Sequence, residues 1–320
     1  MIGPCSRIKR LCLAAHDPKR LLAEARLRYP RIKRLCLAAH DRFAGIAQVA
    51  GAGAVTSTPA PHMGTFAMKS AQNPDHTNLG TLISWLREGR YVIPDFQREF
   101  EWDPWDIRDL IRSIFLDYYI GSLLLWRGKK ETFAALSCEP IYGFEGTSRP
   151  HSIVLDGQQR LTAMYYAFVA PRKPYPNRKG RALFWVRVDR FMTEQYDEAF
   201  VYDYEYDFSS ERLEKFFADR ETQFAEHIFP CAVMGAGGFE LPNWLQGYEQ
   251  YWQNRAAKAQ ESSQLAEAEE ARQHAMNARA FGQHMAELMQ QYQISYIELD
   301  EDLPIDKVCD IFTQLNSKGV

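Results

Sequence analysis

An Asp-Gly-Gln-Gln-Arg string at residues 156–160 carries the side chains best suited to chemistry. An apolar run precedes it and a helical pattern over 158–169 follows, so the sequence predicts a strand, a tight turn at Gly157 and a helix start. The first N–H groups of a helix have no partner within it and form an anion site. The positive charge of Arg160 in the first turn is unfavourable beside the positive end of the helix dipole and destabilises the helix by about 0.3–1 kcal/mol. A phosphate bound there would make the interaction favourable. We therefore predict phosphate binding, with a pairing of Arg160 to a nearby acid as the structural alternative.

Two further polar strings lie at the ends of predicted strands or helices. Residues 93–102, Ile-Pro-Asp-Phe-Gln-Arg-Glu-Phe-Glu-Trp, connect a strand to a helix, and Gln97 and Arg98 supply amide and guanidinium donors. Arginine forks suit phosphate oxygens in pairs. Residues 312–319, Phe-Thr-Gln-Leu-Asn-Ser-Lys-Gly, end the last predicted helix and place Lys318 within reach of a phosphate. The alternatives are a surface loop anchored by aromatic side chains and a simple helix stop with Asn and Gly as a C-cap.

Taken in order, the strings Ile-Pro-x-Phe-Gln-Arg, Leu-Asp-Gly-Gln-Gln-Arg-Leu-Thr and Phe-x-x-Leu-Asn-Ser-x-Gly resemble the N-terminal domain of GmrSD-type restriction systems, over roughly residues 77–320. That family is similar in fold to ParB and sulfiredoxin. The resemblance implies a nucleotide-binding, NTP-hydrolysing regulatory domain of a modification-dependent restriction or phage-defence system. A DNA-binding ParB-like module without catalysis of its own remains the alternative.

The resemblance also implies roles for single residues. The residues expected to bind the nucleotide and its phosphates are Gln97, Arg98, Gly157, Gln158, Gln159, Arg160, Asn316, Lys318 and Gly319. The residues expected to be catalytic are Asp156, Gln159 and Arg160. The expected cofactor is a nucleoside triphosphate with Mg²⁺; the sequence identifies neither its base nor the metal ligands. For Asp156 three roles stay open: capping the helix, positioning Mg²⁺ and orienting attacking water.

The resemblance has one important limit. Full-length members of the family usually continue past the third string, often into a His-Asn-His nuclease module. The eight histidines of this chain do not form such a module, and no cluster of metal-ligand carboxylates is visible, so we expect no nuclease activity from this chain alone. It would then reach DNA through a nuclease module or partner subunit, and a homo-oligomer stays open. A sulfiredoxin-like redox enzyme would need a cysteine at the helix entrance, and residues 157–160 contain none.

The elements that must position these strings belong to a large α+β domain. Apolar residues are 46% of the chain and aromatic residues 13%, which allows a real core. No run of 18 apolar residues occurs, so we expect no membrane span, and six cysteines without regular spacing favour a reducing, cytoplasmic setting. We expect a ParB/sulfiredoxin-like mixed sheet with flanking helices and a helical insertion. The predicted helices are 77–90, 103–115, 158–169, 209–225, 248–292 and 305–315, and the predicted strands 91–93, 122–126, 152–155, 182–188, 200–206 and 294–299.

The N-terminal part differs from the rest in charge. Residues 1–42 hold 11 Lys/Arg and three acids, a net charge of +8. The remaining 278 residues hold 27 basic and 38 acidic side chains, a net charge of −11. The acidic body repels phosphate overall, so contact with a nucleic acid there needs a local basic patch.

The same part contains an eleven-residue string twice, at 7–17 and 31–41, followed by an Ala/Gly/Pro-rich stretch. We therefore divide the chain into a basic arm and linker, 1–67, and a GmrSD N-terminal-like domain, 68–320, truncated at its C-terminal end. The arm is either disordered or translated from upstream DNA, with the true start at Met63 or Met68. A nucleic-acid-binding arm, a targeting peptide and a zinc site built from the duplicated Cys and His are further interpretations.

Overall fold

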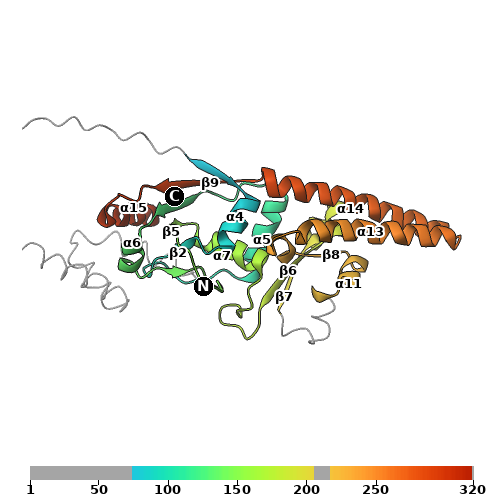
Figure 1. The fold of residues 1–320 in the computed structure, drawn as a ribbon, viewed down its shortest axis with the longest axis horizontal. Coiled ribbons are helices and arrows are strands. Elements are labelled where there is room, and N and C mark those ends of the chain that lie inside the picture. The colour runs from blue at the N-terminus through green and yellow to red at the C-terminus, as the bar shows by residue number, and fades with distance from the viewer. Residues whose placement is uncertain (1–73, 205–216, 319–320) are drawn as a thin grey trace, which may run out of the picture. The chain divides into compact units, whose positions relative to one another are not determined.

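A computed structural model describes residues 74–204 and 217–318, and the side chains of 315–318 are not described (Figure 1). The predictions for residues 1–67 lie outside these ranges. None of the helices in the described ranges is long and apolar enough to cross a membrane.

A mixed six-stranded sheet in the order β1-β9-β3-β5-β2-β4 organises the domain. The pairs β2–β5 and β3–β9 are parallel, and the other neighbours are antiparallel. The strands are β1 Asp75–Asn78, β2 Tyr91–Ile93, β3 Leu123–Arg127, β4 Glu139–Pro140, β5 Ser152–Asp156 and β9 Gln293–Leu299. The predicted α+β class is confirmed. The strand β1, which pairs with β9 from more than 200 residues away, was not predicted from sequence.

Both faces of this sheet are buried. Alternate side chains of a strand point to opposite faces, and in β5 Val154 joins one hydrophobic cluster while Ile153 and Leu155 join another. Three helices cover the first face: α4 Leu79–Arg87, α5 Pro104–Phe115 and α7 Gln158–Val169. Two cover the second: α6 Lys130–Ala135 and α15 Ile305–Lys318.

A second region combines a three-stranded sheet, in the order β7-β6-β8, with a helical hairpin. Its strands are β6 Ala182–Arg187, β7 Phe200–Tyr204 and β8 Ile228–Pro230, and the hairpin helices are α13 Glu240–Glu261 and α14 Leu265–Gln291, which lie side by side in Figure 1. Short helices connect these elements: α8 Val188–Met192, α9 Tyr196–Ala199, α11 Arg220–Ala225 and α12 Ala232–Gly235. The predicted pairing of the strands at 182 and 200 is confirmed.

Several predicted boundaries were wrong. The long helical stretch predicted over 248–292 begins earlier, at Glu240, and is divided into two helices, because the chain turns at residues 262–264, where Ser263 adopts a φ of 58°. The helix predicted from Thr77 begins at Leu79, because Asn78 caps it through a bond from the Thr81 N–H to its side chain. The helix predicted over 209–225 falls partly outside the described residues, and within them Asp219 caps a new helix, α11.

Other predicted elements were placed correctly. Helix α7 and strand β2 have the predicted bounds. Helix α5 covers the predicted range 103–115, with Asp103 as its N-cap and Pro104 as its first helical residue, and the Asp106 carboxylate accepts the N–H of Asp103 at 2.9 Å. The last helix does not stop at Leu315 but continues through Lys318.

Candidate functional site

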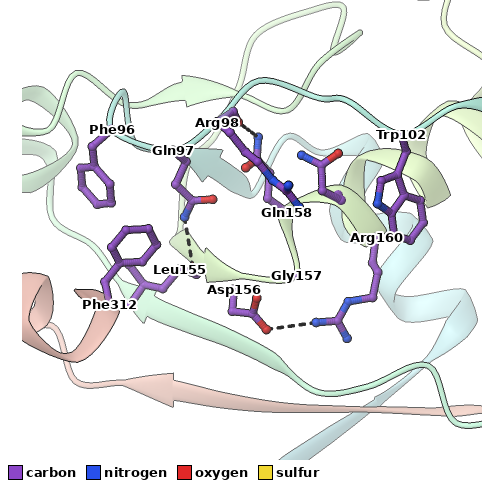
Figure 2. Close-up of a pocket in the computed structure, with 11 residues that line it drawn as sticks. Phe96, Gln97, Arg98, Trp102, Leu155, Asp156, Gly157, Gln158, Arg160 and Phe312 are labelled. Atoms are coloured by element: carbon purple, nitrogen blue, oxygen red, sulfur yellow. Dashed lines mark hydrogen bonds and ion pairs between the residues drawn. The ribbon is translucent and has the colours of Figure 1, made fainter. Parts of the chain in front are cut away.

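A cavity of about 480 Å³ lies where β5 ends and α7 begins (Figure 2). Its volume is within the range of about 300–1,000 Å³ that is usual for small-molecule sites. Residues of all three strings line it: Phe96, Gln97, Arg98, Trp102, Leu155, Asp156, Gly157, Gln158, Gln159, Arg160 and Phe312. The fold thus brings together parts of the chain that are more than 200 residues apart.

The turn at Gly157 creates the start of α7. Gly157 occupies the N-cap position with a φ of 93°, and a Cβ there would lie 2.4 Å from the Leu123 side chain. Leu161 is the first residue whose N–H bonds within the helix, to the Gly157 carbonyl at 3.0 Å. The preceding N–H groups, of Gln158 to Arg160, therefore have no partner within the helix. Because α7 has no acidic residue in its first turn, its positive end is not compensated there.

Asp156 does not cap this helix, so that one of its three expected roles is wrong: Gly157 holds the N-cap position. The Asp156 side chain is 63% exposed, and its Oδ2 lies 3.1 Å from Nη2 of Arg160. It is a carboxylate at the cavity with room for a further ligand. Among the residues described, no group of three His, Cys, Asp or Glu side chains forms a metal site.

Gln158 and Gln159 fasten the 97–101 loop to the start of α7. The amide of Gln158 donates to the Arg98 carbonyl at 2.8 Å. The amide of Gln159 donates to the Glu99 carbonyl at 2.9 Å and accepts the N–H of Glu101 at 3.0 Å. Both side chains are buried. The amide oxygen and amide nitrogen of Gln159 both bond to the loop, and the amide nitrogen of Gln158 does so too, so the backbone N–H groups of both residues are the donors that we consider for a ligand.

Gln97 makes a similar contact from the loop side. Its amide donates to the carbonyls of Val154 and, at 3.2 Å, Leu155 near the end of β5. The contact with Leu155 is drawn in Figure 2. The loop is therefore held to the strand and to the helix at the same time.

Arg160 is held by three hydrogen bonds. Its Nη1 donates to the Ile120 carbonyl at 2.9 Å, and its Nη2 donates to the Ser122 carbonyl at 2.9 Å and to Asp156. The guanidinium has five N–H donors, so two remain without an acceptor among these bonds. The structural alternative, a pairing with a nearby acid, is present, and the predicted phosphate contact stays a prediction.

Arg98 is the less constrained of the two cavity arginines. Its side chain is 65% exposed, against 18% for Arg160. Within the described part of the chain it forms one ion pair, to Glu101, which has a nitrogen–oxygen distance of 3.6 Å and is also exposed. In Figure 2 the Arg98 side chain extends from the loop toward Gln158 at the start of α7. Exposed pairs of this kind contribute little, so Arg98 can turn to another anion at low cost.

Three aromatic side chains add apolar surface to the cavity. Phe96 and Phe312 meet edge to face with their ring centroids 4.9 Å apart, and Trp102 lies at the other side, near Arg160 (Figure 2). The Tyr175 hydroxyl donates to the Trp102 carbonyl. From the sequence, Phe96 and Trp102 were interpreted only as anchors of a surface loop, and Phe312 was given no role of its own. The repeated aromatic residues beside the polar ones were the signal that could have assigned them to the site.

The third string is only partly placed. Phe312 reaches the cavity, Asn316 and Lys318 belong to α15 without described side chains, and Gly319 lies outside the described residues. Their predicted phosphate contacts remain untested. The carbonyls of Ile120 and Ser122, which hold Arg160, were not foreseen, although the positive φ of Gly121 fits the close approach of Arg160.

Comparison with known proteins places the chain in a family. One relative, an uncharacterised protein of Methanocaldococcus jannaschii, is 32% identical over 130 residues, which are 39% of this chain and 22% of that protein. The chain thus spans about a fifth of the length of the curated relative that it matches. The family model described as "GmrSD restriction endonuclease, N-terminal domain" matches residues 79–320. The expected resemblance is therefore confirmed: the chain belongs to the family of GmrSD restriction endonuclease N-terminal domains.

Proposed function

We propose that this domain binds a nucleoside triphosphate with its phosphates over the N-terminus of α7. The observation that carries the proposal is the cavity itself, which is lined both by the first residues of a helix, whose N–H groups have no partner within the helix, and by an exposed arginine. Helix starts of this kind attract phosphate through both their free N–H groups and the helix dipole. The aromatic rings of Phe96, Trp102 and Phe312 offer apolar surface to the base.

The two arginines contribute in different ways. Arg98 is exposed and closes onto the phosphates from the loop, leaving Glu101. Arg160 contacts a phosphate through the two guanidinium N–H groups that have no protein acceptor. Its other three N–H groups bond to Ile120, Ser122 and Asp156 and fix the position of the side chain at the cavity. Arg98 thus supplies affinity, and Arg160 supplies affinity and positioning together.

Mg²⁺ fits this donor set through Asp156. Mg²⁺ bound with a nucleotide typically uses one or two carboxylates together with phosphate oxygens and water, and Asp156 is an exposed carboxylate at the cavity. When bound there, the ion would neutralise phosphate charge during hydrolysis. Asp156 would hold the ion or orient the attacking water. Gln159, whose amide is bonded to Glu99 and Glu101, would act through its backbone N–H and by fixing the loop.

We further propose that nucleotide binding regulates a modification-dependent restriction system acting in the cytoplasm, with DNA reached through a nuclease module or partner subunit. The mixed sheet, with the Asp-Gly-Gln-Gln-Arg string between a strand and a helix, supports the finer ParB/sulfiredoxin-like fold. A ParB-like DNA-binding module without catalysis is the competing function.

Binding of ATP, GTP, CTP and UTP, each with Mg²⁺, tests the proposal by isothermal titration calorimetry. We expect at least one to bind and to be hydrolysed, and Asp156→Asn to retain binding but lose most hydrolysis. The competing function predicts that none of the four binds, while duplex DNA binds with a steep dependence on salt. Hydrolysis that persists in Asp156→Asn would remove Asp156 from the chemistry.

A further inference from the structure

A second polar cavity, of about 230 Å³, lies at the opposite end of β5 from the first. Ser152, the first residue of β5, lines it, whereas Asp156, the last residue, lines the first cavity. The second cavity is lined by Trp85, Arg90, Tyr91, Leu125, Arg127, His151, Ser152, Tyr296 and Glu298. The volume is below the usual range for drug-sized ligands, so a small ligand is the appropriate class.

A chain of hydrogen bonds organises its floor. The Glu298 carboxylate accepts from Arg127 Nη2 at 2.5 Å and from the Ser152 hydroxyl at 2.7 Å. Because the Ser152 proton is directed to Glu298, His151 Nδ1, 2.8 Å from the Ser152 oxygen, is assigned as a donor to that oxygen. Ser152 is 2% exposed, so this network is built into the fold. It fixes the His151 ring and leaves its Nε2 free to take a proton.

The cavity has more positive than negative charge. Arg127 and Glu298 neutralise each other. Arg90 stacks on Trp85, with its guanidinium carbon 4.6 Å from the ring centroid, and no carboxylate in the described ranges forms an ion pair with it. The charged residues that line the cavity therefore sum to +1 with neutral His151 and +2 with protonated His151, and the Glu301 carboxylate acts on His151 from outside the lining.

We propose that this cavity binds a small dianion of the phosphate class, held by the Arg90 fork and by the protonated His151 ring. A guanidinium stacked on an aromatic ring keeps its edge donors available, and that edge matches the spacing of phosphate oxygens. A dianion matches the +2 state, so its binding takes up a proton on His151. A monoanion such as acetate matches the +1 state and takes up none. The site is separate from the nucleotide cavity and does not depend on the function proposed there.

The surroundings of His151 set the direction of its pH dependence. Burial lowers the pKa of His151, Glu298 opposes this shift, and Arg90 and Arg127 add to it. The titratable and charged groups that face His151 or line the cavity are Arg90, Tyr91, Arg127, Tyr296, Glu298 and Glu301. Without a ligand the pKa of His151 therefore lies below its usual value, and a bound dianion raises it. Affinity for the dianion should increase as the pH falls.

The test is a titration of the full chain with sodium sulfate, a dianion that does not itself titrate, followed through the imidazole NMR signal of His151. The signal is assigned with His151→Gln, and the other seven histidines are internal references. We expect sulfate to raise the pKa of His151, and acetate at the same ionic strength not to. This readout is local, so sulfate bound at the start of α7 does not affect it. An unchanged His151 pKa at about 50 mM sulfate would overturn the proposal.

Arg90→Gln should weaken sulfate binding by about ten- to a hundredfold, the effect of losing charge-assisted hydrogen bonds. Arg108→Gln, the same change at a partly exposed helix position outside the cavity, is the matched control and should have no effect. Arg90→Lys keeps the charge without the fork and should bind at an intermediate level. Equal binding by wild type and a folded Arg90→Gln would show that any sulfate effect is nonspecific.

Inorganic phosphate and glycerol phosphate, titrated in the same way, separate the two sources of the ligand. Tighter binding of the ester would assign the site to a phosphorylated small molecule, and tighter binding of the ion would assign it to free phosphate. If neither compound shifts the His151 signal, the assignment to phosphate is wrong.

Discussion

Different kinds of interaction stabilise the two regions of this domain. At the end of the six-stranded sheet that holds the nucleotide cavity, which we call the cavity end, polar side chains bond to backbone carbonyls of distant loops, as Arg160 does to Ile120 and Ser122. At the hairpin end, aromatic rings pack on one another: Trp244 lies 4.9 Å from Phe229 and 5.2 Å from Phe224, centroid to centroid.

This difference separates the effects expected of substitutions. Apolar burial stabilises the whole fold in proportion to the area removed from water. A side chain bonded to loop carbonyls fixes the position of a few groups and contributes about 1 kcal/mol per bond. Changes at the hairpin end should therefore act mainly on global stability, and changes at the cavity end mainly on ligand binding.

The largest expected effect is that of Trp244→Ala in α13. Trp244 is fully buried, and its Nε1 donates to Gln223 at 2.8 Å. We expect a loss of about 3–5 kcal/mol in the free energy of unfolding, measured by urea denaturation. Phe239→Ala, at a residue that is 79% exposed beside the same helix, is the control and should cost less than about 0.5 kcal/mol. Similar losses in both variants would contradict the assigned packing.

The free energy of unfolding is expected to depend on pH through His227, which lies at the hairpin end. His227 stacks on Trp252 with a centroid distance of 4.7 Å, and burial, followed by the charge of His274, lowers its pKa to about 4. A His with a depressed pKa in the folded state contributes stability that is complete above its unfolded pKa of about 6.5 and is lost as the pH falls toward 4. The total loss is up to about 3.5 kcal/mol, because the pKa is lowered by about 2.5 and each pH unit corresponds to about 1.4 kcal/mol.

Urea denaturation of the wild type and His227→Asn between pH 7.5 and 4 measures this contribution. Asparagine tolerates the positive φ of 55° at this position. The variant should have a flatter pH dependence, while His76→Asn, an exposed control, should follow the wild type. Parallel curves for wild type and His227→Asn would assign the acid sensitivity to other groups.

Arg160→Ala should affect both binding and stability. The variant leaves the carbonyls of Ile120 and Ser122 without their donor, which costs about 1–3 kcal/mol. The helix dipole by itself predicts almost no loss of stability, since the substitution removes a charge from the positive helix end; the observed bonds predict the opposite. Nucleotide affinity should fall about ten- to a hundredfold. Melting temperature and nucleotide affinity, measured on the same variant, separate a role of Arg160 in binding from a purely structural role. A variant with lower stability but unchanged affinity would make Arg160 purely structural.

The smallest expected effect comes from Gly121→Ala, which disturbs Arg160 without altering its charge. A Cβ at Gly121 would lie 2.5 Å from Arg160 Nη1. The matched control is Gly146→Ala, which also has a positive φ but no heavy atom within 4 Å of the added Cβ. Both should lose about 1 kcal/mol through backbone strain, but only Gly121→Ala should weaken nucleotide binding. Equal affinities would show that the position of Arg160 does not matter to the ligand.

The parts of the fold that sequence predicted are those with local signals. Pro104 at a first helical position and Gly157 before α7 each mark a helix start, and both starts were placed correctly. The hairpin was missed because its turn contains Ser262 and Ser263 with no Gly or Pro, inside a stretch rich in helix formers.

In the candidate site, sequence identified the strings but not their bonds. The carbonyls that hold Arg160 belong to a loop about 40 residues earlier in the chain. Carbonyl groups have no sequence signature, so their use as acceptors could not be foreseen. For the same reason sequence did not separate the exposed Arg98 from the constrained Arg160.

The most direct test of the account is the affinity of Arg98→Ala for the nucleotide that binds best with Mg²⁺, measured by calorimetry. The substitution keeps the Arg98 carbonyl that accepts from Gln158, so the loop should stay in place and the melting temperature unchanged. We predict a loss of affinity of about ten- to a hundredfold, with Arg108→Ala binding as the wild type does. Wild-type affinity in a folded Arg98→Ala would contradict a phosphate position between this loop and the start of α7.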